Sequence, residues 1–338
     1  MDQVNLKRLA KELNLAVSTV SRALSDSHDI SEETKKKVLA LARKLNYQPN
    51  PFARSLRNRS SKTIAVILPE IANNYFSVAI NGIEEVAQAN NYHVLIYITH
   101  ESFQKEAAIV RLLLNGRVDG ILMSLSGGAE DTDHLAELQK SNIPVVFFDR
   151  VSDTFDTIRV TTNNFESGYL ATTHLISRDC QRIAYLTFSG DLSIEQQRMK
   201  GYLEAVQKHG LSTAEDLIVR CDTNAEESYK KIKKMLGRDD RPDGVFASVE
   251  SLAIYVYEAC AELRLRIPED VKIIGFSNLR TASLLNPALT TITQPAFNMG
   301  REAARVLFEV LKKPHVKMED NTIVLRSNLV ERRSTAIS

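Results

Sequence analysis

Four polar side chains near the beginning of the chain have the size and chemistry to contact DNA. Ser18, Thr19, Ser21 and Arg22 lie within one short stretch. Small hydroxyl groups can approach phosphates and base edges, and an arginine can donate two hydrogen bonds to a guanine. The residues by themselves also allow a blander interpretation, in which this is the polar face of a small helical bundle and meets only solvent.

The spacing of apolar residues predicts three short helices that would position these side chains. Apolar residues from Leu6 to Leu13 recur at helical spacing, and Asn14 follows where a tight turn needs a residue that tolerates the left-handed conformation. A second helix is expected over about 17–25, and a third begins after Ser31, a good N-cap. Helices joined by such a tight turn form a helix-turn-helix, whose second helix enters the major groove of DNA.

The segment 48–61 joins this head to the rest of the chain and contains a second candidate for DNA contact. Asn50 can cap a helix, and Pro51 suits the first helical position. Three arginines surround Ala53 and Leu56 in a helix of only about two turns, which would be marginal in isolation. Two interpretations remain open: a flexible tether, or a hinge helix that becomes ordered on DNA and inserts Leu56 into the minor groove.

Charge is distributed unevenly along the 338 residues, whose net charge is only +1. The first 60 residues carry 12 basic and 6 acidic side chains, whereas the remainder carries 31 basic and 36 acidic ones. A basic head on a mildly acidic body suggests that the head meets a polyanion.

Several classes of protein have no support in the sequence. No apolar run approaches the roughly 20 residues that cross a bilayer, and the first residues contain no apolar signal core, so we expect a cytoplasmic protein without a membrane partner. The three cysteines are far apart and the seven histidines are scattered, so we expect no metal site. Phosphate-loop, dinucleotide-binding and nucleophile-elbow motifs are absent, so we expect neither a cofactor nor enzyme activity.

Beyond Lys62, apolar segments of strand length alternate with amphipathic helices. The expected strands include 63–68, 93–99, 120–124, 145–148, 183–188, 244–247 and 271–275. Alternation of helices with continuously apolar strands indicates parallel sheets covered on both faces. Because the pattern restarts after about residue 160, we expect two similar α/β lobes, with ligands bound outside the carboxyl ends of the strands.

Residues that directly follow the predicted strands are candidates for binding a small molecule. Asn74, Tyr75 and Phe76 follow the first strand, and the aromatic rings could stack on a sugar or a base; a core role for Phe76 is the alternative. Asp149 and Arg150 follow the fourth strand. The carboxylate can accept hydrogen bonds from hydroxyl groups, while Arg150 could instead pair with a neighbouring acid.

Several motifs resemble those of the LacI/GalR family of bacterial repressors. In the head and the segment after it, these are VSTVSRAL at 17–24, ISEET at 30–34, LNYQPN at 45–50 and ARSL at 53–56. In the body they include VDGI at 118–121, VFFDR at 146–150, IIGF at 273–276, PALTTI at 287–292 and LVERRS at 329–334. The resemblance therefore covers nearly the whole chain.

The resemblance implies a homodimer that binds a palindromic operator in double-stranded DNA and responds to a small effector, most often a carbohydrate. It implies an all-α helix-turn-helix head at 1–47, a hinge helix at 48–61, and an α/β effector-binding and dimerisation domain at 62–338. The implied fold of that domain is the periplasmic-binding-protein type I fold with two parallel-sheet lobes. Because its chain crosses three times between the lobes, we expect one lobe at about 62–161 and 291–322 and the other at about 162–290 and 323–338.

The resemblance also assigns residues to each site. DNA contacts are expected from Leu6, Val17, Ser18, Thr19, Ser21, Arg22, Ser31, Thr34, Asn50, Ala53 and Leu56. Effector contacts are expected from Asn74, Tyr75, Phe76, Asp149, Arg150, Asn164, Arg198, Thr223, Ser277 and Gln294. Ser277 stands where many relatives carry an aspartate, and Val249 where some sugar-binding relatives carry an asparagine. This chain thus lacks polar contacts that those relatives use, and no particular sugar or purine carries over to it.

Overall fold

The computed structural model describes residues 5–47, 60–72, 74–126, 133–152, 155–188, 192–222, 224–313 and 321–336. Contacts between residues divide the chain into two compact units, Met1–Ser61 and Lys62–Ser338. In the described ranges, no helix is both long and apolar enough to cross a bilayer.

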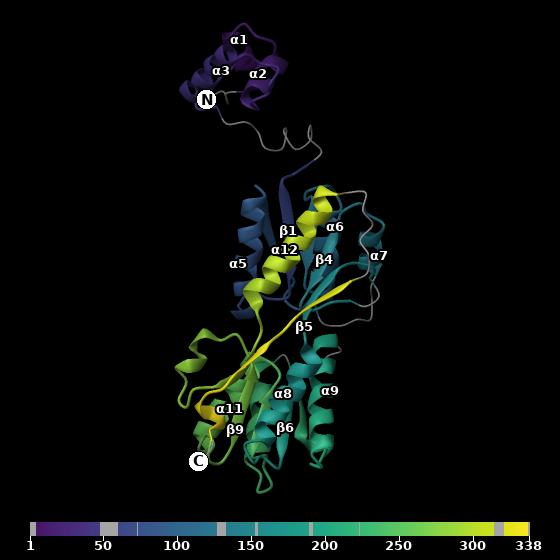
Figure 1. The fold of residues 1–338 in the computed structure, drawn as a ribbon, viewed down its shortest axis with the longest axis vertical. Coiled ribbons are helices and arrows are strands. Elements are labelled where there is room, and N and C mark those ends of the chain that lie inside the picture. Colours follow the sequence, from purple (N-terminus) through teal and green to yellow (C-terminus); the bar gives the residue numbers. More distant parts are fainter. Residues whose placement is uncertain are drawn as a thin grey trace. The chain divides into compact units, whose positions relative to one another are not determined.

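The first unit contains the three helices expected from the apolar spacing (Figure 1): α1 (Leu6–Glu12), α2 (Val17–Leu24) and α3 (Glu32–Lys44). Leu9, Val20 and Val38, one from each helix, are fully buried in a common core. Asn14 has a φ of 52°, the left-handed conformation that the turn between α1 and α2 requires. The side chain of Ser31 accepts a hydrogen bond from a backbone amide in the first turn of α3, which confirms its capping role.

The second unit contains two sheets, and each sheet is the centre of one lobe. We call these lobes lobe N and lobe C. The strands of lobe N are β1 (Thr63–Leu68), β2 (His93–Ile98), β3 (Gly120–Met123), β4 (Val145–Phe148), β5 (Arg159–Thr162) and β11 (Thr322–Leu325). Those of lobe C are β6 (Ile183–Phe188), β7 (Ile218–Cys221), β8 (Gly244–Ala247), β9 (Lys272–Phe276), β10 (Thr290–Thr293) and β12 (Asn328–Val330). The strand orders, β11-β5-β4-β3-β1-β2 and β12-β10-β9-β8-β6-β7, follow the same plan in both lobes.

The strands of both sheets pair in parallel, as expected, with one exception. The edge strand β12 runs antiparallel to β10, so the sheet of lobe C is parallel except at this edge. Within β1, Ile64 and Leu68 pack into one core cluster and Ala65 and Ile67 into another. This division shows why the strand is apolar at every position from Ile64 to Leu68: helices cover both faces of the sheet.

Helices connect the strands and cover the sheets: α5 (Asn74–Ala89), α6 (Phe103–Leu113), α7 (Asp133–Gln139) and α12 (Ala296–Lys312) in lobe N, and α8 (Asn164–Ile176), α9 (Ser193–Lys208), α10 (Ala225–Leu236) and α11 (Glu250–Leu263) in lobe C. Three short 3₁₀ helices complete the described elements: η1 (Glu215–Leu217), η2 (Arg280–Ser283) and η3 (Arg333–Thr335). In each lobe, one helix enters directly from the other lobe: α8 follows β5, and α12 follows β10.

Two of the three crossings between the lobes lie a few residues later than expected. The chain crosses at 163, at 294–295 and at 326–327, because β10 pairs with β9 in lobe C and β11 pairs with β5 in lobe N. The expected boundaries at 291 and 322 are corrected accordingly. The apolar pattern identifies a strand but not the sheet that it joins, since strand pairing depends on residues far away in the sequence.

The helices that cross between lobes pack against their neighbours backbone to backbone. Figure 1 shows α12 lying along α5, and α8 packs in the same way on α9. A side chain does not fit at the contact: a Cβ atom on Gly168 of α8 would lie 2.2 Å from the carbonyl oxygen of Arg198, and one on Gly300 of α12 would lie 2.0 Å from that of Ala79. Glycine is therefore required at both positions for this close approach.

We expect Gly168→Ala to lower the free energy of unfolding by about 1–3 kcal/mol, because the added methyl group forces α8 and α9 apart. A change of this size would lower the Tm by roughly 2–4 °C per kcal/mol in a domain of this size. Thermal unfolding followed by calorimetry is the measurement. Gly237→Ala is the matched control, since the nearest atom to a Cβ there is 3.3 Å away. Equal Tm values for the two variants would contradict the packing argument.

Candidate functional site

The second helix of the head turns a mixed polar and apolar face outward. Val17 is 42 % exposed, Ser18 and Arg22 are exposed, and Thr19 and Ser21 are half-buried. The opposite face of α2 packs into the core of the head. An exposed valine beside hydroxyl and guanidinium groups offers an apolar contact for a thymine methyl group together with donors for phosphates and guanine.

The other predicted DNA contacts lie at the edges of the described head or beyond it. Leu6 is half-buried against the head core. Ser31 accepts a hydrogen bond from the Thr34 amide at 3.3 Å, and their hydroxyl groups lie 2.9 Å apart. Ser31 remains exposed while it caps α3. The remaining predicted contacts, Asn50, Ala53 and Leu56, lie outside the described residues.

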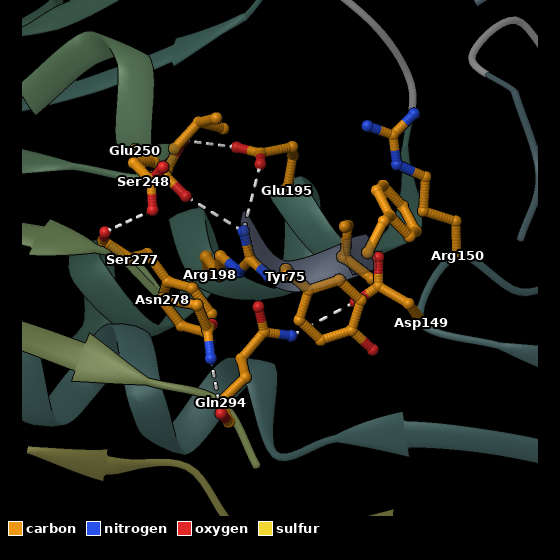
Figure 2. Close-up of a pocket in the computed structure, with 14 residues that line it drawn as sticks. Tyr75, Asp149, Arg150, Glu195, Arg198, Ser248, Glu250, Ser277, Asn278 and Gln294 are labelled. Carbon is orange, nitrogen blue, oxygen red and sulfur yellow. Dashed lines mark hydrogen bonds and ion pairs between the residues drawn. The ribbon is translucent and has the colours of Figure 1, made fainter. Parts of the chain in front are cut away.

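A pocket lies between lobe N and lobe C at the carboxyl ends of the strands (Figure 2). It holds about 450 Å³, counting the space at its open mouth. The lining residues are Tyr75, Phe76, Asp149, Arg150, Ile194, Glu195, Arg198, Ser248, Val249, Glu250, Phe276, Ser277, Asn278 and Gln294. This edge of an open α/β sheet is where ligands of such folds bind.

Arg198, near the start of α9, is the centre of a buried polar network in this pocket. Its Nε donates to Oδ1 of Asn164 at 3.0 Å, and its Nη1 donates to the carbonyl oxygen of Ser248 at 2.9 Å. Nη1 also lies 3.3 Å from Oε1 of Glu195, whose other oxygen accepts a hydrogen bond from the Ser248 hydroxyl at 2.6 Å. The guanidinium lies 3.6 Å from the centre of the Phe276 ring. Arg198 is therefore desolvated but paired, which fixes its position in the wall of the pocket.

Asp149 is buried and adopts an uncommon backbone conformation directly after β4. Its φ of 61° is in the left-handed region, which aspartate tolerates better than most residues. Its Oδ1 accepts a hydrogen bond from Nε2 of Gln294 at 3.1 Å. Burial raises the pKa of Asp149, and the charges of Arg198 and Arg150 offset this only in part. Burial, assisted by the Asp149 carboxylate, also raises the pKa of Tyr75 well above its usual range. Backbone strain and a displaced pKa in a cleft are typical of functional sites.

Arg150 pairs with an acid, which is the alternative that the sequence left open. Its Nη1 lies 2.9 and 2.8 Å from the two carboxylate oxygens of Glu101, which precedes α6. Its Nε is buried and has no hydrogen-bond partner among the residues that the structure describes. The charge of Arg150 is thus neutralised within the protein, while its Nε–H group remains able to donate a hydrogen bond to a ligand.

Glu250, the first residue of α11, joins the two lobes. Its Oε1 accepts a hydrogen bond from Nδ2 of Asn74, which begins α5 in lobe N, at 2.6 Å. Its Oε2 accepts one from Oγ of Ser277, also at 2.6 Å. Figure 2 shows the side chains of Glu250 and Ser277 meeting in the pocket. The Glu250 carboxylate therefore lies beside the Ser277 hydroxyl in the lining of the pocket.

Most of the predicted effector contacts come together in this pocket, and their role in binding stays a prediction. Asn74 and Asn164 lie behind the lining, where they contact Glu250 and Arg198. Phe76 lines the pocket and is also part of the core of lobe N. Thr223 lies outside the described residues.

Sequence reasoning missed four polar lining residues, which are Glu195, Ser248, Glu250 and Asn278. Two signals could have identified them. Glu195 lies three residues before Arg198, on the same face of a helix, and the others directly follow the strands β8 and β9 at their carboxyl ends.

Comparisons with known proteins agree with this architecture. Residues 5–50 match the family model described as bacterial regulatory proteins, lacI family, and residues 172–335 match the periplasmic binding protein-like domain. The chain is 33 % identical over 337 residues to the HTH-type transcriptional repressor PurR of Proteus mirabilis, covering 98 % of this chain and 96 % of that protein.

Solved structures resemble the chain over most or all of its length. The Lac repressor dimer bound to operator and an anti-inducer is 23 % identical, with a TM-score of 0.85 and coverage of 100 % of both chains. A LacI-family regulator from Enterococcus faecium with bound ribose is 29 % identical, with a TM-score of 0.70, and covers 81 % of this chain and 98 % of that one.

We expect Asp149→Asn to stabilise the ligand-free protein at neutral pH. Burial raises the pKa of Asp149 in the folded state, so this carboxyl group ionises more readily in the unfolded chain. As the pH rises above the pKa of the unfolded chain, ionisation therefore favours the unfolded state and lowers the free energy of unfolding of the wild type. The advantage of the variant should grow as the pH rises from about 4 through the raised pKa and should vanish below about 4. The measurement is the difference in Tm between variant and wild type across this range.

Asp240→Asn is the matched control for this titration. Asp240 is exposed, and its hydrogen bond with Arg238 lowers its pKa, so its replacement should give no gain in Tm at neutral pH. A gain for Asp149→Asn that does not depend on pH would contradict the assignment.

Proposed function

Since the chain belongs to the LacI family of bacterial regulatory proteins, which are transcriptional regulators and not enzymes, we propose that it represses transcription as a homodimer on a palindromic operator, under the control of a small effector. The head binds DNA, and the body binds the effector in the pocket between its lobes. Because its target is chromosomal DNA, the protein acts in the cytoplasm.

The observation that carries this proposal is the exposed face of α2. In a helix-turn-helix the second helix lies in the major groove with its N-terminal residues at the base edges. Val17 and Ser18 are at that end of α2, and Arg22 is one turn further along the same exposed face. The net positive charge of the first 60 residues supplies the attraction to the phosphate backbone.

Two heads are needed to read one operator. A single helix-turn-helix contacts only a half-site, and dimers of this class bind half-sites about one helical turn apart. A two-fold symmetric protein therefore matches a palindrome. In this proposal the segments 48–61 of the two subunits meet at the operator centre and insert Leu56 from each side.

The crossings between the lobes support a coupling of the two sites. Gln294 lies in one crossing and its side chain binds Asp149 of the pocket. The side chain of Asn163, in a second crossing, accepts a hydrogen bond from the amide of Ser327, in the third, at 2.8 Å. An effector that contacts both lobes changes the position of one lobe relative to the other. Lobe N begins with β1, which directly follows the segment 48–61 in the sequence. The effector thereby favours one state of that segment over the other.

The pocket suits a small carbohydrate. It combines aromatic rings with many hydrogen-bonding groups. Hydroxyl groups both donate and accept, which matches a lining of carboxylates, amides and guanidinium groups. The similar regulator from Enterococcus faecium holds ribose, which supports this class of ligand.

We expect Arg22→Ala to weaken operator binding by about 1–3 kcal/mol, which is roughly 5- to 150-fold in Kd, because a bidentate contact to a guanine is lost. The operator is first selected from genomic fragments with the wild-type protein, and Kd values are then measured by gel shift at fixed salt. Lys230→Ala removes the same charge from an exposed position of α10 and serves as the control. Equal losses in the two variants would show that only the net charge matters.

We expect Leu56→Ala to weaken operator binding while leaving effector affinity within about twofold of wild type, because the wedge contacts only DNA. Operator Kd by gel shift and effector Kd by calorimetry give the two readouts. An unchanged operator Kd would remove the leucine wedge from the proposal.

A further inference from the structure

Acidic side chains outnumber basic ones in the lining of the pocket. Asp149, Glu195 and Glu250 are present against Arg150 and Arg198. When an effector fills the pocket and excludes water, an unbalanced charge there becomes costly unless the effector compensates it. The charge and the hydrogen-bonding groups of the pocket therefore constrain the chemistry of its ligand.

Both cations of the lining are already engaged by the protein. The two oxygens of Glu101 hold Nη1 of Arg150 at 2.9 and 2.8 Å. Arg198 binds Glu195 and Asn164 and stacks on Phe276. An anionic effector such as a sugar phosphate would have to compete with these carboxylates for the guanidinium groups. Displacing Glu195 from Arg198 would leave a buried carboxylate without its cationic partner, which is strongly unfavourable.

The other two acids accept their hydrogen bonds from neutral groups, although the charges of Arg198 and Arg150 also act on Asp149. Asp149 accepts its hydrogen bond from the Gln294 amide at 3.1 Å, and Glu250 accepts those from Asn74 and Ser277 at 2.6 Å. No ion pair to either carboxylate occurs in the described ranges of the chain. A carboxylate can accept about four hydrogen bonds, so both retain capacity for a ligand. Because Asp149 belongs to lobe N and Glu250 to lobe C, a cation bound between them is attracted by both lobes.

A further unsatisfied acceptor lines the same pocket. Nδ2 of Asn278 donates to the carbonyl oxygen of Gln294 at 2.8 Å, which fixes the orientation of the amide. Its Oδ1 is then a buried acceptor that has no partner among the described residues. The buried Nε of Arg150 is the corresponding donor. A hydroxyl group can serve either atom, whereas an aliphatic ligand can serve neither.

We propose that the effector is a polyhydroxylated amine in its protonated form, such as an amino sugar, and that Glu250 selects its ammonium group. This inference rests on the proposed function of the pocket and narrows the class of effector. Charge-assisted hydrogen bonds to a carboxylate are about twice as strong as neutral ones, so the ammonium group gains more here than the hydroxyl group that it replaces. Glu250 thus supplies the selective charge from α11, next to the hydroxyl of Ser277.

The test is isothermal titration of the full-length protein with matched sets of sugars at about pH 6.5, where such amines are largely protonated. Each set contains a neutral sugar, its 2-amino derivative and its 6-phosphate, for glucose, galactose and mannose. We expect at least one amino sugar to bind about tenfold or more tightly than its neutral parent. The phosphates should bind more weakly than the neutral parents.

Variants of one position identify the selective group. Glu250→Gln keeps the acceptor for Asn74 but removes the charge, and should reduce the preference for the amine to within about twofold. Glu250→Asp retains the charge and should retain the preference, which separates the effect of charge from a loss of folding. Glu258→Gln, at an exposed position of the same helix, is the control and should behave as wild type.

Three outcomes overturn the inference: tighter binding of a neutral or phosphorylated sugar than of its amine, an unchanged preference in Glu250→Gln, or no binding of any amino sugar. The proposed function is judged separately, by operator binding of the wild-type protein in gel shifts with and without each sugar. Release or recruitment by a neutral sugar would uphold the proposed function while refuting the inference about the amine.

Discussion

The rest of the pocket depends on the pairing and hydrogen bonding of the buried Arg198 guanidinium. A charge removed from water costs several kcal/mol unless it is paired and hydrogen-bonded. Its partners come from separate stretches of chain: Asn164 on α8, Glu195 on α9 and the carbonyl oxygen of Ser248 after β8. Phe276 at the end of β9 supplies the surface on which it stacks. The ends of these elements therefore have to converge on one point, which becomes the wall of lobe C.

Close packing of backbones fixes the geometry of this network and connects it to the crossings between the lobes. Gly168 allows α8 to approach α9 at the backbone of Arg198, and Gly300 allows the equivalent approach of α12 to α5. Both α8 and α12 begin directly after a crossing between the lobes. The helix pair in each lobe therefore begins at a segment where the chain crosses between the lobes. A movement of one lobe relative to the other at these crossings would also move α8 and α12.

The pocket also shows how one fold accommodates different ligands. Ser277 itself brings only a hydroxyl group to the pocket, yet the Glu250 carboxylate lies 2.6 Å from that hydroxyl. Pairing with Glu101 offsets the charge of Arg150, although the residue still lines the pocket. Changes of this kind alter the charge that a ligand meets and leave the packing of the sheets untouched, which is why a family fold does not specify an effector.

Local signals were enough to predict the three helices of the head, the cap at Ser31, the left-handed turn at Asn14 and the alternation of buried strands with helices. The sequence also placed Asp149, Arg198 and Gln294 in the cleft through their positions in family motifs. The assembled fold was needed to show which sheet β10 and β11 join, that β12 runs antiparallel, that Glu101 pairs with Arg150 and that Glu250 lines the pocket. These features depend on contacts between residues far apart in the chain, such as the 176 positions that separate Asn74 from Glu250. Local periodicity carries no information about such pairings, because strand partners and charge partners are selected when the whole core is assembled.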